Sequence, residues 1–144
     1  MKTLTLIILL SFFAMQIYAY KEADLLRLLD TGSCPLGDLS GVDLSFRNLD
    51  GANLGMAHLE GANLTGASLR AVNLSMAYLE GANLSRSDLR DSNLRKVNFS
   101  DADLFLANLE GSNVEGAVFY NARNVNFNGT RGAVFWEIDY PEKE

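Results

Sequence analysis

The chain is poor in the residues that build most small catalytic and metal sites. Its 144 residues include one cysteine, one histidine and two prolines. A single cysteine excludes an intrachain disulfide framework and a zinc site made of thiolates. A single histidine leaves little basis for histidine catalysis or a histidine-bound metal. Since Walker loops, zincin motifs, nucleophile elbows and calcium-binding nonapeptides are also missing, the sequence predicts no enzymatic activity, no cofactor and no metal.

Positive charge is scarce as well. The chain carries 12 Lys and Arg against 18 Asp and Glu, a net charge of −6. A basic surface is the usual footprint of a nucleic-acid binder, so no nucleic-acid partner is expected. The 48% of apolar and 21% of charged residues lie near globular averages, which argues against disorder.

The N-terminal apolar run is too short for a comfortable membrane span. It extends from Leu4 to Met15, whereas a spanning helix needs roughly 20 residues. Lys2 before it and Ala19 after it complete a secretory pattern, so residues 1–19 are predicted to be a signal peptide, with an uncleaved anchor as the alternative. Cleavage after Ala19 changes the net charge from −6 to −7, and it leaves a mature chain without a stable membrane span. The expected location is the periplasm or the medium, or the thylakoid lumen in a photosynthetic source.

What the sequence has in abundance is a period of five. Every fifth residue from 39 to 119 is large and apolar, and the residue two places earlier is usually small. A helix would rotate each fifth side chain by about 500°, and a flat strand would turn it to the opposite face. The chain must therefore change direction within every five residues to keep both columns inside. Glycines such as Gly51 and Gly61 fall at the expected corners, where positive φ angles are useful.

The large apolar column forms the predicted core. Each buried leucine contributes very roughly 1.5–3 kcal/mol, and stacked coils bury one another's leucines. The residues assigned to this core are Leu54, Leu59, Leu64, Leu69, Leu74, Leu79, Leu84, Leu89, Leu94, Phe99, Leu104 and Leu109. Arg47 occupies the small column, which predicts either a corner open to solvent or a slip in register there.

The tandem A(N/D)LXX pattern resembles the pentapeptide-repeat family. The motif occurs at Ala52-Asn53-Leu54, Ala62-Asn63-Leu64, Ala82-Asn83-Leu84, Ala102-Asp103-Leu104 and Ala107-Asn108-Leu109. A ten-residue superperiod in the same region favours a coil with an even number of sides. The resemblance covers about residues 39–127 and implies an all-β fold, a right-handed quadrilateral β-helix of twenty residues per coil and about four coils.

Both ends depart from the repeat, as a solenoid that needs caps requires. Residues 20–37 are predicted to be an N-terminal cap with a short helix, 38–127 the β-helix, and 128–144 a C-terminal cap or tail. The register fails at Asn124. The helix is expected over residues 21–30 as a lid on the first coil, with apolar residues Leu25, Leu26, Leu28 and Leu29.

The apolar segment 133–138 is expected to cap its own rod. The resemblance adds a second interpretation, a homodimer through the C-terminal end. It also implies that a second cysteine often stands at the position of Gly37, where it would bond the first. Without that second cysteine, Cys34 is either buried under the helix or bonded between chains.

A twenty-residue coil places certain side chains above one another on the surface. Asn53, Asn73, Asn93 and Asn113 form one such ladder, which we interpret as structural rather than ligand-binding. Glu60 and Glu80 form another, preceded by His58 and Tyr78; solvated carboxylates are favoured there over a calcium site, which needs six or more oxygens.

Outward-facing apolar residues are the candidate partner surface. Phe46, Phe105 and Leu106 are assigned to one face, and Met56 and Met76 to another, with Glu60 and Glu80 as further surface candidates. The sequence thus predicts an exported, non-catalytic scaffold that binds an unknown protein partner. The family resemblance supplies one alternative, a mimic of acidic duplex DNA that binds a topoisomerase such as gyrase. The negative net charge permits that alternative, and the predicted signal peptide opposes it.

Overall fold

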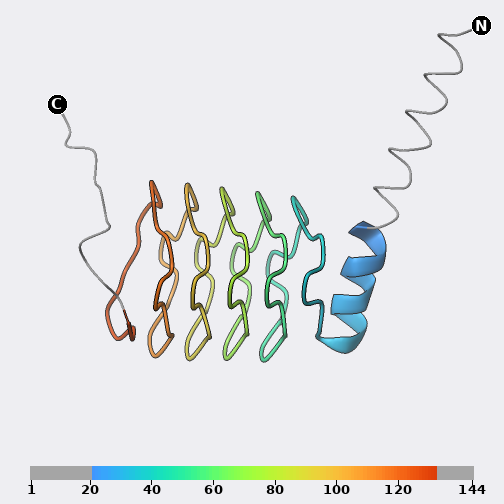
Figure 1. The fold of residues 1–144 in the computed structure, drawn as a ribbon, viewed down its shortest axis with the longest axis horizontal. Helices are drawn as coiled ribbons and strands as arrows, with labels where there is room; N and C mark the ends of the chain where they lie inside the picture. Colours follow the sequence, from blue (N-terminus) through green and yellow to red (C-terminus); the bar gives the residue numbers. More distant parts are fainter. Residues whose placement is uncertain (1–20, 133–144) are drawn as a thin grey trace, which may run out of the picture.

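The computed structural model of the protein describes residues 21–132. The predicted signal peptide at 1–19 and the segment 133–144 lie outside these residues. The described chain is one helix followed by a stack of coils of similar size (Figure 1). Neighbouring coils are joined by isolated parallel bridges, almost all between residues twenty apart, and residues 21–132 contain no longer strand. None of the described residues forms a helix long and apolar enough to cross a membrane.

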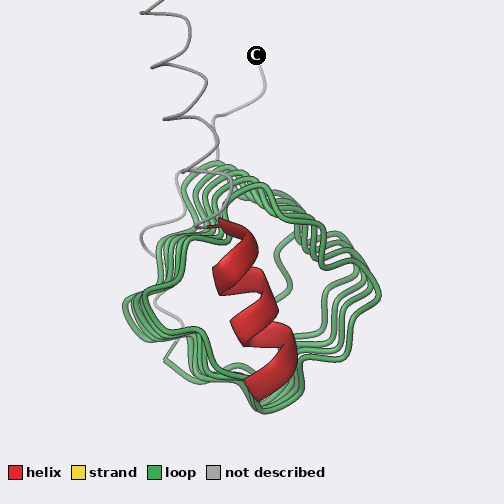
Figure 2. Ribbon diagram, turned by 90° about the vertical axis from the view of Figure 1, so that its right-hand side faces the viewer, coloured by secondary structure: helices red, strands yellow, loops and turns green. Residues whose placement is uncertain are grey.

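The coils follow one another in close register along the stack. One column of bridges joins Ser33, Asn53, Asn73, Asn93, Asn113 and Arg131 in five successive steps. The stack therefore holds about five coils rather than the expected four. Pairing begins at Ser33, inside the segment 20–37 that was assigned to the cap, so Cys34 takes the first place in the apolar column. Viewed along the stack, the coils lie over one another (Figure 2).

Each five-residue unit turns the chain through the same hydrogen bonds. Ala57 N–H donates to Leu54 C=O at 3.1 Å, which closes a four-residue turn. The third residue of this turn, Met56, has φ 56°, the left-handed angle found at that place in type II turns. Leu54 N–H donates in turn to Asn73 C=O of the next coil at 2.8 Å. A turn and an inter-coil bond in each unit account for the period of five.

The interior consists of the two inward columns. The twelve residues assigned to the core are all 0–1% exposed. Ser87, Ser92 and Ser112 in the small column are buried too, and each hydroxyl donates to a backbone carbonyl, as Ser92 Oγ does to Leu69 at 2.8 Å. Arg47 is exposed and its neighbour Asn48 keeps its bridge to Ser68, so this corner opens to solvent without a slip in register.

The helix spans residues 21–31 and lies across the open end of the first coil (Figure 2). Only part of its predicted apolar face is used. Leu28 is buried and Leu25 is partly buried against the core, whereas Leu26 and Leu29 are 61% and 45% exposed. Because residues one apart are separated by about 100° around a helix, the two pairs face different directions. Gly32, with φ 67°, ends the helix and donates its N–H to Leu28 C=O.

Three of the four members of the predicted asparagine ladder, Asn53, Asn73 and Asn93, are linked by hydrogen bonds. Asn73 Nδ2 donates to Asn53 Oδ1, and Asn93 Nδ2 donates to Asn73 Oδ1, both at 3.0 Å. Asn73 Oδ1 also accepts the backbone N–H of Ser75 at 3.2 Å. One side chain thus joins two neighbouring coils and holds its own corner.

We expect Asn73→Ala to destabilise the fold more than Asn108→Ala. The first substitution removes three hydrogen bonds, and the second removes only the acceptor for Glu110 N–H at 3.0 Å. With about 0.5–1.5 kcal/mol for each hydrogen bond, the difference in the free energy of unfolding should be about 1–3 kcal/mol. Urea denaturation of both variants measures it. Equal losses would mean that the bonds between asparagines add no stability.

Candidate functional site

A line of exposed apolar side chains runs along one corner of the rod. Met56 and Met76, on consecutive coils, are each 46% exposed. The structure adds Leu36, which is 69% exposed at the equivalent place on the first coil and was missed in the sequence. Leu36 lies twenty residues before Met56, so the twenty-residue repeat could have identified it from the sequence. We call Leu36, Met56 and Met76 the apolar corner.

The fold itself gives no reason for large apolar side chains at this corner. The φ angles of Leu36, Met56 and Met76 are 59°, 56° and 59°. A left-handed angle costs a residue with a Cβ about 1–2 kcal/mol, and glycine occupies the same place in other units, as at Gly61 with φ 64°. Each of these three residues therefore has a strained backbone angle and a side chain that is exposed to water.

Phe46 has a contact within the fold. It is 78% exposed, but a Cβ at Gly66 would lie 2.7 Å from two carbons of its ring, so the ring packs over that glycine. Leu106 occupies the same corner three coils later, with Gly66 and Arg86 between them. Phe46 and Leu106 therefore share a face, as expected, without forming a continuous apolar surface.

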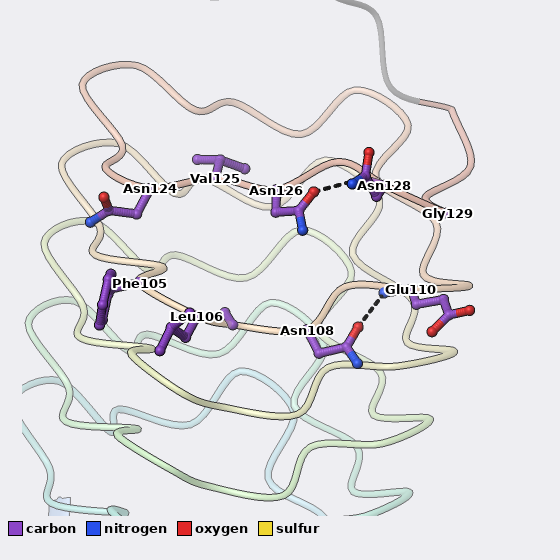
Figure 3. Close-up of a pocket in the computed structure, with 10 residues that line it drawn as sticks. Phe105, Leu106, Asn108, Glu110, Asn124, Val125, Asn126, Asn128 and Gly129 are labelled. Carbon is purple, nitrogen blue, oxygen red and sulfur yellow. Dashed lines mark hydrogen bonds between the residues drawn. The ribbon is translucent and has the colours of Figure 1, made fainter.

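Phe105 and Leu106 lie at a groove near the C-terminal end of the described chain. The groove has a volume of about 680 Å³. It is lined on one side by residues 105–108 and Glu110 and on the other by residues 124–126, Asn128 and Gly129. Figure 3 shows Phe105 and Leu106 on the coil below and Asn124, Val125 and Asn126 on the segment above. Phe105 is 46% exposed and Leu106 65% exposed. The groove thus combines apolar side chains with the amides of Asn108, Asn126 and Asn128.

Glu60 and Glu80 differ from the solvated carboxylates that were expected. Glu60 Oε1 lies 2.8 Å from His58 Nδ1, and Glu80 Oε1 accepts a short hydrogen bond from Asn98 Nδ2. The Oε2 atom of each is buried and lacks a hydrogen-bond partner. The rings of His58 and Tyr78 are stacked with centroids 4.9 Å apart, because equivalent side chains on adjacent coils lie one above the other. No three His, Cys, Asp or Glu residues within 21–132 are grouped to hold a metal ion.

Charges of both signs alternate on the remaining surface. Arg90 donates from Nε and Nη2 to the two carboxylate oxygens of Asp88, at 2.8 and 2.5 Å. These bonds hold the pKa of Asp88 below its ordinary value. Asp50 Oδ1 accepts from the backbone N–H of Arg70 at 2.9 Å. Asp50, Arg70, Arg90 and Glu110, which lie twenty residues apart on successive coils, thus form a surface of mixed charge.

Cys34 is buried under the helix, which is one of the two alternatives left by the sequence. Its Sγ donates to Asp24 C=O at 3.3 Å and accepts from Arg27 Nη2 at 3.1 Å. A Cβ at Gly37 would collide with this sulfur. Gly37, the position at which the resemblance implies a second cysteine, is therefore adjacent to Cys34 in space.

The comparisons with known proteins agree on one family. The model of pentapeptide repeats matches residues 38–75, 48–86, 73–111 and 82–121. No curated protein sequence matches the chain. Among solved structures, a pentapeptide-repeat protein from the thylakoid lumen of Arabidopsis thaliana is 32% identical, with 72% of this chain and 68% of that chain covered and a TM-score of 0.60.

Two cyanobacterial pentapeptide-repeat proteins are also similar. One from Nostoc is 28% identical, covers 74% of this chain and 88% of its own, and has a TM-score of 0.65. One from Cyanothece is 28% identical, covers 77% and 92%, and has a TM-score of 0.51. Their shared fold is a β-helix, in keeping with the stacked coils and parallel bridges of this chain. The family match and the stack of coils with a twenty-residue repeat lead to one conclusion: the chain belongs to the pentapeptide-repeat family.

Proposed function

We propose that the protein is a non-catalytic scaffold, a right-handed quadrilateral β-helix that binds a protein partner through its apolar corner. The observation that carries this proposal is the column of Leu36, Met56 and Met76. All three are exposed apolar side chains on three consecutive coils. Every unit turns through a left-handed angle at this place, so what the fold does not require is a large apolar side chain there. An apolar line on a rigid rod suits a contact with another protein.

An enzymatic role finds little support in the described residues. His58 pairs with Glu60 on the surface, whereas Cys34 is buried beneath the helix. A nucleophile and a base must lie within hydrogen-bond reach of each other. We therefore assign the protein no catalytic residues.

We place the protein outside the cytoplasm, in the periplasm, the medium or a thylakoid lumen. The secretory pattern at 1–19 supports this location, and one similar protein comes from a thylakoid lumen. Subcellular fractionation of the source cells tests it, together with N-terminal sequencing of the recovered chain. A cytoplasmic protein that still begins at Met1 would contradict export.

The alternative, a mimic of DNA that binds gyrase, requires a face of uniform negative charge. The column of Asp50, Arg70, Arg90 and Glu110 interrupts the negative charge of one face with two cations. We expect the protein to leave supercoiling by gyrase unchanged. Inhibition at stoichiometric concentration would favour the mimic over the scaffold.

The scaffold proposal is tested by capture from the source compartment. The double variant Met56→Asn/Met76→Asn removes the apolar corner, and asparagine tolerates positive φ, so the fold is retained. The matched control, Arg86→Asn/Asp101→Asn, changes two corner residues of other columns, with φ 61° and 60°. We expect a specific protein to bind the wild type and the control and to be lost from the methionine variant. A protein set that is the same for all three baits would sink the proposal.

A further inference from the structure

The ladder of hydrogen bonds between coils is interrupted at the groove. Arg86 N–H donates to Phe105 C=O at 2.7 Å, and Leu89 N–H donates to Asn108 C=O at 2.8 Å. The equivalent donors one coil later, Leu106 N–H and Leu109 N–H, have no backbone acceptor within residues 21–132.

The acceptor between these two donors is open as well. Ser87 C=O accepts from Asn108 N–H at 2.9 Å, but no backbone N–H of the described chain reaches the equivalent Ala107 C=O. Intact bonds lie on both sides, from Leu104 N–H to Arg123 C=O at 3.0 Å and from Gly111 N–H to Gly129 C=O at 2.9 Å. Residues 106–109 are thus a short strand edge with two unpaired backbone donors and one unpaired backbone acceptor. Intact hydrogen bonds between the coils flank this edge on both sides.

A shortened last coil produces this gap. The bridge between Asn113 and Arg131 joins residues eighteen apart, whereas the other bridges join residues twenty apart. Positive φ angles of the last coil fall at Asn124 and Gly129, each two residues before the corner expected twenty residues after Leu106 and Gly111. Asn128 N–H donates to Asn126 Oδ1 at 3.0 Å instead of to the coil below. Residues 124–128 therefore stand apart from residues 105–108, whereas Gly129 packs on Glu110 (Figure 3).

We propose that the chain's own residues 134–140 dock into this groove as an added strand. Their sequence, Val-Phe-Trp-Glu-Ile-Asp-Tyr, is rich in β-branched and aromatic residues. From Trp136 to Tyr140, apolar and acidic residues alternate, which is the pattern of a strand with one face buried. An extended segment brings both N–H and C=O groups to the free edge, and Trp136 brings apolar surface to Phe105 and Leu106.

The described chain ends close to the groove, so residues 134–140 begin within reach of it. Gly129 lines the groove, and Gly132, three residues later, has φ 77°, an angle that allows the chain to reverse. The sequence continues for twelve residues past Gly132, and a chain of that length spans up to about 40 Å. The segment can therefore return to the groove from which the chain has just departed.

Trp136 reports on docking directly, because it is the only tryptophan in the chain. In the full chain we expect its fluorescence to be shifted to short wavelength and protected from acrylamide, equally at all protein concentrations. Hydrogen exchange should show the amides of Leu106 and Leu109 protected like those of Arg86 and Leu89. Tryptophan emission at the wavelength of free indole, with unprotected amides, would overturn the proposal.

Two matched variants locate the occupied surface. Leu106→Asn changes the groove, and Leu36→Asn changes an equally exposed corner leucine, at 65% and 69% exposure with φ 57° and 59°. Leu106→Asn should shift the emission of Trp136 to longer wavelength and increase its quenching, while both variants keep the wild-type melting temperature. Leu36→Asn should leave the emission unchanged.

Two other occupants give different results. Burial of Trp136 that grows with protein concentration would assign the groove to the segment of a second copy, against our proposal. A response of Trp136 to Tyr120→Asn but not to Leu106→Asn would place the segment on the final coil instead, where Tyr120 is 57% exposed. Either outcome would reject docking of residues 134–140 into their own groove.

Discussion

Replacing Leu74 by aspartate is expected to abolish folding. Leu74 is fully buried near the middle of the stack, and its backbone N–H and C=O both bond, to Asn93 and to Ala77. A buried, unpaired carboxylate costs several kcal/mol, a large share of the about 5–15 kcal/mol that stabilises a typical domain. Because each coil is stabilised by its neighbours, failure in a central coil removes support from both halves of the rod.

Circular dichroism and thermal denaturation measure this effect, and Met76→Asp is the matched control. Met76 lies two residues away in the same coil, is 46% exposed and has φ 59°, which aspartate tolerates. We expect Met76→Asp to melt cooperatively near the wild-type temperature. A soluble Leu74→Asp protein with the same cooperative transition would refute the inward assignment of the leucine column.

The interior was predictable because one residue type repeats at one spacing over most of the chain. Leu54, Leu74 and Leu94 are buried for the same reason, and a single argument about direction reversal places all of them. The corner angles followed from the same argument, since Gly51 and Gly61 mark them in the sequence. Periodicity assigns a residue to the inside or the outside of a coil with little further information.

Features that depend on a break in the period were not predictable. Pairing at Ser33 extends the stack under the helix, where Cys34 replaces a leucine and hides the repeat. The groove arises from two missing residues in the last coil, and a failed register at Asn124 does not reveal which hydrogen bonds are lost. The buried Oε2 atoms of Glu60 and Glu80 depend on how adjacent side chains pack, and sequence spacing does not specify that.

The helix provides the second large effect, because Asp24 holds it on the first coil. Asp24 Oδ2 accepts the backbone N–H of Asp38 at 2.8 Å, and Oδ1 accepts from Arg27 Nη2 at 2.9 Å. Arg27 in turn contacts Cys34 Sγ at 3.1 Å. The carboxylate thus joins helix, coil and thiol, and its removal leaves the Asp38 N–H without that acceptor.

We expect Asp24→Ala to expose the thiol of Cys34 far more often than in the wild type. Loss of a charged acceptor from a partly buried hydrogen bond costs about 1.5–3 kcal/mol, and each 1.4 kcal/mol is about a factor of ten in an equilibrium. When local opening is fast relative to labelling, the labelling rate follows the population of the open form. Cys34 is completely buried, so its reaction with an aromatic disulfide reagent should accelerate by about 10- to 100-fold.

Asp30→Ala separates this effect from a general loss of helical charge. Asp30 is exposed in the last turn of the same helix, and its carboxylate takes part in no hydrogen bond or ion pair of the described chain. A negative charge at a helix C-terminus is unfavourable, so Asp30→Ala should leave labelling unchanged or slow it. If both variants accelerate labelling equally, Asp24 does not hold the helix in place. If neither does, the packing of Leu25 and Leu28 and the bond from Lys21 to Ser40 keep the thiol covered without Asp24.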